Sequence, residues 1–140
     1  MPASAYIKNA YLTWRTGSVF PSAPATLYVS LHTANPNDTG LNEVSTSGTG
    51  YLRQPISSTQ WSAIVTGTPS TIASTVDCRF PQATGSGYSI LYGGIWDAAT
   101  AGHFLEYQFL ANTNNGTSAI TVSTGNTYDL PTGSVTGSVS

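Results

Sequence analysis

The chain has 140 residues, of which only 7% are charged, against about 25% in an average soluble domain, and its net charge is −2. Its few basic residues are scattered and form no basic patch, which argues against nucleic acid as the main partner. No apolar run reaches the ~20 residues that span a bilayer, and no secretion signal is present, so we expect a protein made in the cytoplasm with no membrane partner.

Neutral polar residues, chiefly Thr, Ser and Gly, take the place of the missing charged residues. Such a composition can indicate disorder, but disordered chains are poor in aromatic residues and rich in net charge, whereas 11% of this chain is aromatic. We therefore expect residues 1–140 to fold as a single domain without help from disulfides. A net charge near zero suits a protein that is packed into an assembly.

Residues 1–17 carry a helical periodicity. Ile7, Tyr11 and Trp14 recur at spacings of four and three, which places them on one apolar stripe of a helix, and Ser4 is a suitable N-cap. This N-terminal helix either plugs one end of a β core or docks on a neighbouring subunit.

The period changes to two in the segment that follows the prolines after Phe20. Leu27, Val29 and Leu31 alternate with polar residues, which predicts a strand with these three side chains buried. His32 ends the strand on the opposite face, where we expect it to be half-exposed.

Residues 33–50 form the longest turn-like stretch of the chain, rich in Pro, Gly, Asn and Ser, and we expect a long exposed loop. Such a loop is a good candidate for contact with a partner. Asp38 and Glu43, with two neighbouring Asn residues, could offer oxygen atoms to calcium. The spacing of a calcium-binding loop is missing, however, so we expect a solvated turn and no metal.

Further short strand patterns lie between turn clusters and predict the fold class. The strand patterns cover 51–61, 71–80, 87–96, 103–110, 118–124 and 127–135, and the turn clusters include 97–102, closed by Gly102, and 112–116. Short strands at this spacing with no second helix predict an all-β fold, namely an antiparallel β-sandwich or jelly roll with one short N-terminal helix. The tail is either a last edge strand or a frayed end.

Residues suited to catalysis are present but form no recognisable motif. His32 and His103 are far apart in sequence, the six acidic residues are spread singly, and no nucleophile elbow or phosphate-binding loop occurs. The single Cys78 excludes an internal disulfide and lacks the neighbours of a zinc site, so we expect a small packed side chain. We therefore expect no enzymatic activity and no cofactor.

Three tryptophans are the most conspicuous large side chains. Trp14, Trp61 and Trp96 could stack against sugars, anchor a protein interface or fill the core. The hairpin turn that follows Trp96 favours the core for that residue, whereas the first two remain open between core and interface.

Ordered blocks of sequence follow the N-terminal helix, and together they resemble a known family. The blocks are PATLYVSLHTANP (24–36), NEVS (42–45), GYLRQ (50–54), GIWDAA (94–99) and GNT (125–127). With the helix, they resemble a family of small virion structural proteins from tailed bacteriophages, which are labelled as tail-fibre-like or head-decoration proteins.

The resemblance implies a non-enzymatic virion protein. We expect first a capsid decoration (cement) protein on the outer head surface, a homotrimer bound to the major capsid protein, which stabilises the shell because it binds only the assembled state. A tail fibre or baseplate component is the alternative, and a carbohydrate-binding module is the third option. The candidate interface residues are Ile7, Tyr11, Trp14, Asp38, Glu43, Arg53 and Trp61.

Overall fold

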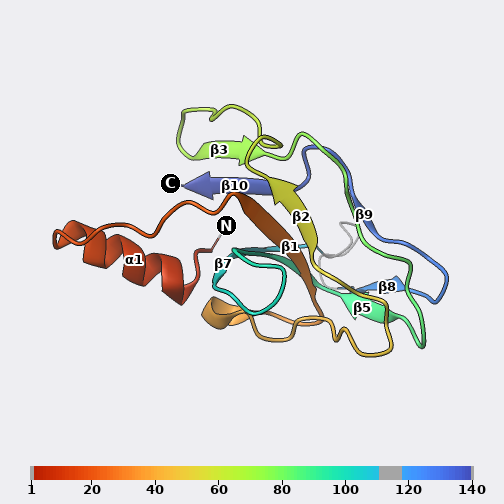
Figure 1. Cartoon of the computed structure of the whole chain (residues 1–140). Coiled ribbons are helices and arrows are strands. Elements are labelled where there is room, and N and C mark those ends of the chain that lie inside the picture. Colours follow the sequence, from red (N-terminus) through yellow and green to blue (C-terminus); the bar gives the residue numbers. More distant parts are fainter. Residues whose placement is uncertain (1, 111–117, 140) are drawn as a thin grey trace.

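The computed structural model of the chain describes residues 2–110 and 118–139. It is built mainly from antiparallel β-strands, with one short N-terminal helix, as the sequence predicts (Figure 1). The turn predicted at 112–116 lies outside the described residues.

The helices and strands are short and are separated by many turns. In chain order they are helix α1 (Ala5–Arg15), strand β1 (Thr26–His32), the 3-10 helix η1 (Asn37–Thr39), and strands β2 (Gln54–Ser57), β3 (Ser70–Ala73), β4 (Cys78–Arg79), β5 (Tyr88–Ile90), β6 (Tyr92–Trp96), β7 (Phe104–Phe109), β8 (Ile120–Val122), β9 (Asp129–Leu130) and β10 (Thr136–Val139).

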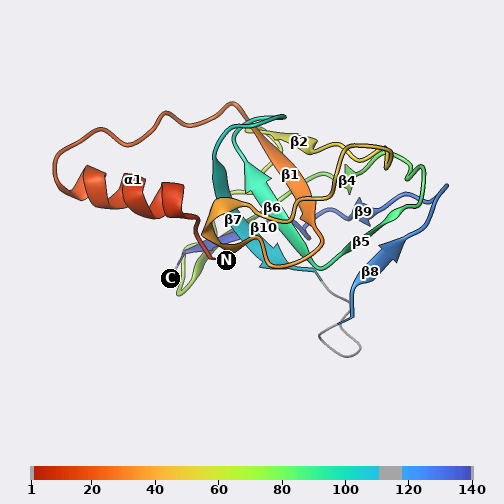
Figure 2. The same cartoon turned by 90° about the horizontal axis from the view of Figure 1, so that it is seen from below.

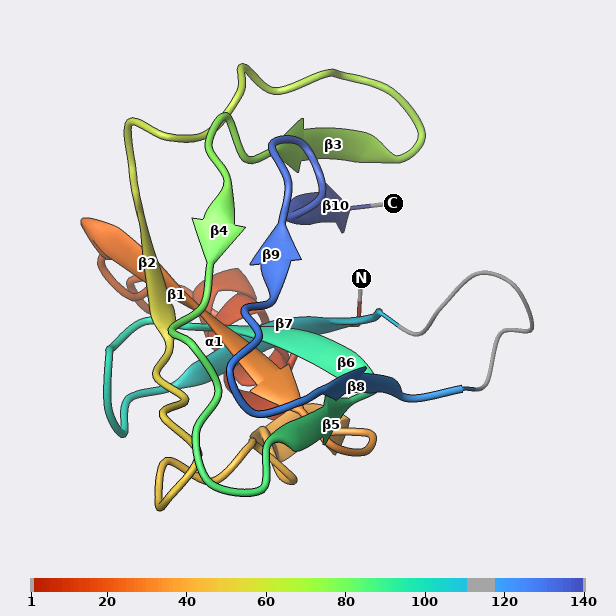
Figure 3. The ribbon, with the colours of Figure 1, turned by 90° about the vertical axis from the view of Figure 1, so that its right-hand side faces the viewer.

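A four-stranded antiparallel sheet in the order β2-β1-β6-β7 is the largest unit of the fold. The central pair β1–β6 aligns Tyr28 with Trp96 and His32 with Tyr92, and a bulge interrupts the β6–β7 register at Ile95. Three two-stranded antiparallel pairs, β10-β3, β4-β9 and β5-β8, complete the strands (Figures 2 and 3).

The hydrophobic core is formed between one face of the four-stranded sheet and the two-stranded pairs. The four-stranded sheet and the pairs β4-β9 and β5-β8 each contribute buried side chains to this core. The pair β10-β3 contributes none, but Val135, just before β10, is part of the core. Cys78 is 3% exposed, which confirms the prediction of a small packed side chain. The buried members of this cluster are Val29, Leu31, Val44, Tyr51, Ile56, Cys78, Phe80, Ala83, Tyr88, Ile90, Ile95, Val122, Leu130 and Val135.

Strand β1 is buried on both faces, which the sequence did not predict. Val29 and Leu31 are buried as expected, and Leu27 packs half-buried against the core. His32, however, is fully buried, so the expectation of a half-exposed strand end was wrong. The reason is that the loop after β1 folds back over this face, where the His32 ring also packs against Phe104.

The C-terminal tail is a strand, which decides between the two alternatives left by the sequence. Residues 136–139 pair with β3, from Thr136 opposite Ala73 to Val139 opposite Ser70. Gly102 closes the β6–β7 hairpin with φ +77°, as predicted for a left-handed position. A Cβ atom there would lie 2.4 Å from the Asp97 carboxylate, so the turn requires glycine.

Helix α1 starts on the β body and then projects away from it. Ser4 caps the helix, since its hydroxyl accepts a hydrogen bond from the Ile7 amide at 3.3 Å. Ala10 is the buried residue of the helix, whereas residues 11–25 are all exposed. Figures 1 and 2 show the helix extending to one side and the following segment returning to β1. We call residues 5–25 the helix lobe.

Candidate assembly interface

The helix lobe carries a group of large apolar side chains in contact with solvent. Tyr11 and Trp14, both predicted as interface residues, are 51% and 53% exposed, and their rings lie 5.9 Å apart. Leu12 beside them and Val19 and Phe20 in the returning segment are exposed as well. Several exposed large apolar side chains on one projecting element are typical of an interaction site.

The base of the lobe is fixed to the body. The Ser4 amide donates to the Leu105 carbonyl at 2.8 Å, and Lys8 forms an exposed ion pair of 2.7 Å with Asp38 in η1. Ile7 is half-buried, in a hollow that it shares with Phe20 and Leu105. Of the predicted stripe, Ile7 therefore anchors the lobe, whereas Tyr11 and Trp14 point away from the body.

Glu43 and Arg53, which are predicted interface residues, form a bidentate ion pair. Arg53 Nε and Nη2 lie 2.8 and 2.7 Å from the two Glu43 carboxylate oxygens. The Tyr51 hydroxyl donates to the same carboxylate at 2.8 Å and accepts from the Leu31 amide at 3.1 Å. The pair thus connects the loop of residues 33–50 to β1 and to the core.

Arg53 also binds the β6–β7 hairpin. Its Nη1 donates to the carbonyls of Ala98 and Ala101 at 3.0 and 2.8 Å, and its guanidinium lies 3.7 Å from the centre of the Trp96 ring. The side chain is 8% exposed. Arg53 therefore serves the fold in this structure, and its contact with a partner stays a prediction.

Of the remaining predicted residues, Trp61 lies apart from the helix lobe, whereas Asp38 pairs with Lys8 at the base of the lobe. Trp61 is half-buried, packs against the core and forms an isolated backbone bridge with Ser74. Asp38 and Glu43 face different partners, Lys8 and Arg53.

Within residues 2–110 and 118–139, no group of three or more His, Cys, Asp or Glu side chains is placed to hold a metal ion. No helix in this part of the chain is long and apolar enough to span a membrane.

A buried hydrogen-bond chain links β1, β6 and the loop. Trp96 Nε1 donates to the Ser30 hydroxyl at 3.0 Å, and Ser30 lies 2.8 Å from His32 Nε2. His32 Nδ1 lies 2.7 Å from the Leu41 carbonyl. Because a carbonyl can only accept, Nδ1 carries the proton, and Nε2 accepts from Ser30. Each polar group in this series of hydrogen bonds therefore has a partner when the His32 imidazole is neutral.

The burial of His32 predicts a pH dependence of stability. Burial lowers the pKa of His32 below its ordinary value of 6.5, although the hydrogen bond to Leu41 acts in the other direction. The unfolded chain therefore binds the proton more readily than the folded chain. We expect the contribution of His32 to the free energy of unfolding to be complete above pH 6.5 and to be lost as the pH drops below it. The full loss is about 1.4 kcal/mol for each unit by which the pKa of His32 in the folded chain lies below 6.5.

Chemical denaturation between pH 5 and 8 measures this dependence. The His32→Gln variant, which keeps a donor and an acceptor but cannot titrate, is expected to lose the slope. His103→Gln, at an exposed histidine, is the matched control and should keep it. An equal slope in wild type and His32→Gln would contradict the assignment.

A second apolar surface lies over the paired strands β3 and β10. Ile64, Val65 and Val139 are 69%, 63% and 78% exposed, and a hollow of about 290 Å³ extends from Ile64 and Val139 to Glu106 of β7. We call this feature the β3–β10 groove. The sequence did not indicate this groove, because the three segments that form it are far apart in the chain. The one available signal was Glu106, a lone acid inside an otherwise uncharged strand pattern.

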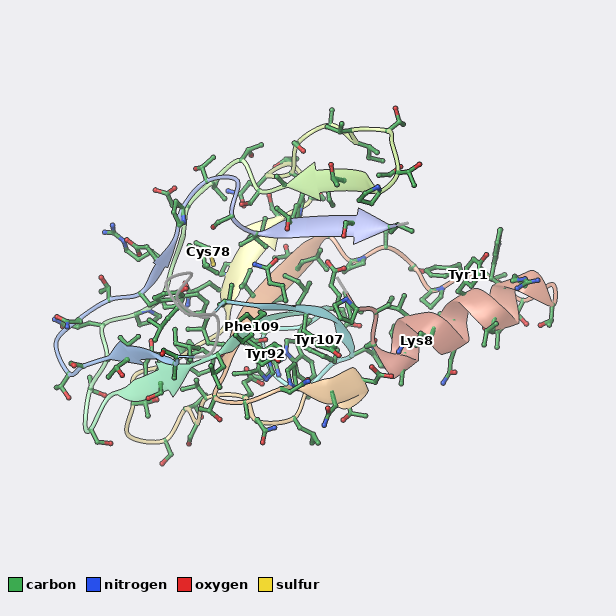
Figure 4. All side chains as sticks on the ribbon, turned by 180° about the vertical axis from the view of Figure 1, so that it is seen from behind. Lys8, Tyr11, Cys78, Tyr92, Tyr107 and Phe109 are labelled. Carbon is green, nitrogen blue, oxygen red and sulfur yellow. The ribbon has the colours of Figure 1, made fainter. Side chains whose placement is uncertain are left out.

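Three aromatic rings gather on the outer face of the four-stranded sheet. Tyr92 lies 6.1 Å from Tyr107 and 5.1 Å from Phe109, measured between ring centres, and Phe109 is 46% exposed. Figure 4 shows these rings together on the sheet, well separated from Lys8 and Tyr11 on the helix. Carbohydrate binding stays a prediction, for which the exposed Phe109 and the half-buried Tyr92 and Tyr107 are the rings available for stacking.

Comparison with known families gives a match over almost the whole chain. The family model described as "Podophage GP4 fiber I protein gp80" matches residues 2–138 and so covers both the helix lobe and the β body. No curated protein matches the chain.

Proposed function

Because the chain belongs to the podophage GP4 fiber I protein gp80 family, and is therefore a phage virion structural protein, we propose that it is a non-enzymatic building block of a fibre. In this role the helix lobe joins one copy of the chain to another copy. The function is mechanical, since the product is an assembled structure and no bond is made or broken.

The exposed apolar surface of the helix lobe is the observation that carries the proposal. Tyr11 and Trp14 lie on a projecting element that contributes little to the core of its own chain. Burying such aromatic side chains at an interface contributes about 2 kcal/mol or more each where they are central to it. The family description supports the fibre, and the low net charge supports dense packing of copies.

Assembly in solution tests the proposal. We expect the wild-type chain to self-associate, as the homotrimer prediction requires, and the double variant Tyr11→Ser/Trp14→Ser to be a monomer by analytical ultracentrifugation. Leu52→Ser removes an apolar side chain of similar exposure, 57%, outside the lobe and is the control. A wild-type chain that stays monomeric at its highest soluble concentration, and binds no other virion protein, refutes the proposal.

Capsid decoration is the second candidate, and the same lobe supports it. An exposed aromatic surface can bind the major capsid protein as well as a second copy, and a low net charge suits the outside of a densely packed shell. The family description favours the fibre over the capsid surface. Cryo-electron microscopy of virions separates the two candidates, because density for the chain on the head alone removes the fibre, and density on the tail alone removes decoration.

A further inference from the structure

Most charged side chains in the described part of the chain pair with one another. The pairs are Lys8 with Asp38, Arg53 with Glu43, Arg79 with Asp129 and His103 with Asp97, while Asp77 accepts two hydrogen bonds from Thr132. Within residues 2–110 and 118–139, the side chains of Arg15 and Glu106 form no hydrogen bond or ion pair. This cation and this anion lie on the two exposed apolar surfaces.

Glu106 lies in the β3–β10 groove. Its carboxylate is half-buried beside Ile72, and a Cβ atom at Gly137 would lie 3.5 Å from its Oε1. Burial raises the pKa of Glu106, and the positive amino terminus lowers it by less. The amino terminus offsets only part of the cost of burying this carboxylate in apolar surroundings, and a cation brought into the groove would reduce the remainder.

Arg15 is the last residue of α1 and lies next to the exposed aromatic side chains of the helix lobe. Leu12 and Tyr11 are three and four residues before it and therefore neighbour its side chain on the helix surface, and Trp14 directly precedes it. The lobe thus presents an apolar surface with one free positive charge. Arginine is well suited to a partly buried pair with a carboxylate, because its planar guanidinium donates two parallel hydrogen bonds.

We propose that the helix lobe of one copy docks in the β3–β10 groove of a second copy, where Arg15 pairs with Glu106. Apolar side chains from the lobe then cover Ile64 and Val139. The hollow of about 290 Å³ is at the small end of ligand pockets, which span about 300–1,000 Å³, and suits a few protein side chains. The inference rests on the self-assembly proposed above and names the two surfaces that meet.

In the proposed arrangement each copy offers its lobe to one neighbour and its groove to another, so the contact is heterologous. Such a contact closes into a ring, of which a trimer is one case, or continues as an open filament. A symmetric dimer in which two lobes pack against each other is excluded by this arrangement.

Neutral variants of the two charges test the pairing. Glu106→Gln removes one charge at constant size, and Arg15→Gln removes one charge with a shorter polar side chain. Each is expected to weaken self-association about 30-fold or more, measured by analytical ultracentrifugation. The double variant should lose little beyond either single change, because the two groups act as one pair. Arg79→Gln, at an exposed pair on β4, is the control for charge and should associate like the wild type.

Mixing two defective variants tests the heterologous geometry. Trp14→Ser/Arg15→Glu removes the lobe surface, and Val139→Lys blocks the groove at a side chain that is 78% exposed and therefore tolerates the change. Each variant alone is expected to be a monomer, whereas the mixture forms a complex of one copy of each, through the one intact lobe and the one intact groove. Circular dichroism confirms that each variant is folded.

The outcomes separate this inference from the proposed function. If the lobe variants are monomers but Val139→Lys and Glu106→Gln assemble like the wild type, the lobe does not dock in the groove. Self-assembly through the lobe is then still supported. If the two variants fail to combine on mixing, the heterologous contact is overturned. A wild-type chain that does not self-associate overturns both the inference and the fibre assembly.

Discussion

Replacing Arg53 with alanine is expected to lower the free energy of unfolding by about 3–5 kcal/mol, as is typical when one member of a buried ion pair is removed. The change leaves the Glu43 carboxylate, whose side chain is 22% exposed, without its bidentate partner. It also frees two carbonyls of the β6–β7 hairpin and uncovers one face of Trp96. Urea denaturation followed by tryptophan fluorescence measures the loss.

The Arg79–Asp129 pair provides a matched control. It has the same bidentate geometry, with both distances at 2.9 Å, but its side chains are 71% and 37% exposed. Arg79→Ala is therefore expected to cost much less than Arg53→Ala, since solvent screens an exposed pair. Equal costs for the two variants would show that the hydrogen bonds and stacking of Arg53 contribute nothing beyond a surface pair.

Removing the Tyr51 hydroxyl is expected to cost about 2–3 kcal/mol, near the upper end of the usual range for a buried group left without its partner. In Tyr51→Phe, the Leu31 amide loses an acceptor, and the Glu43 carboxylate loses a donor. The ring itself remains, together with its packing against Phe80 and Tyr88. The same denaturation experiment measures the change.

Tyr88 offers the opposite case in the same cluster. Its hydroxyl is buried and forms no hydrogen bond with any described residue, and burial raises its pKa. Tyr88→Phe is therefore expected to leave the free energy of unfolding unchanged or to raise it, because no bond is lost and an unsatisfied polar group is removed. A loss of stability in Tyr88→Phe as large as in Tyr51→Phe would contradict this account of both hydroxyls.

The local elements of the fold could be predicted because their signals are contained in short segments. The spacing of Ile7, Tyr11 and Trp14 and the cap at Ser4 predict α1, and the alternation before His32 predicts β1. The position of Gly102 predicts the left-handed turn of the β6–β7 hairpin. Each of these patterns depends on backbone geometry over a few residues.

The strand pairing and the burial of polar residues could not be predicted in this way. The pattern at 71–80 contains two strands, β3 and β4, which pair with β10 and β9 respectively, and no local feature marks the break. His32 is polar, so its position at a strand end suggests exposure. Its burial depends on Ser30 and the Leu41 carbonyl, which satisfy both ring nitrogens after the loop folds back.

The candidate interface was only partly accessible for the same reason. The exposed Tyr11 and Trp14 follow from the helical stripe, but the groove that we propose as their receptor combines Ile64, Glu106 and Val139 from three distant segments. The sequence also places Arg53 among possible surface contacts. Only the fold shows that this guanidinium is occupied by the chain's own carboxylate and carbonyls.

The buried thiol of Cys78 makes this chain convenient for site-directed labelling. It is the single cysteine of the sequence, it is 3% exposed, and burial raises its pKa to about 12, so the thiolate that reacts with maleimides is scarce at neutral pH. A cysteine introduced at Ser86, in the exposed turn before β5 and outside both proposed contact surfaces, would react alone without removal of the native one. A gold or fluorescent tag attached there would mark the position of each copy within the particle.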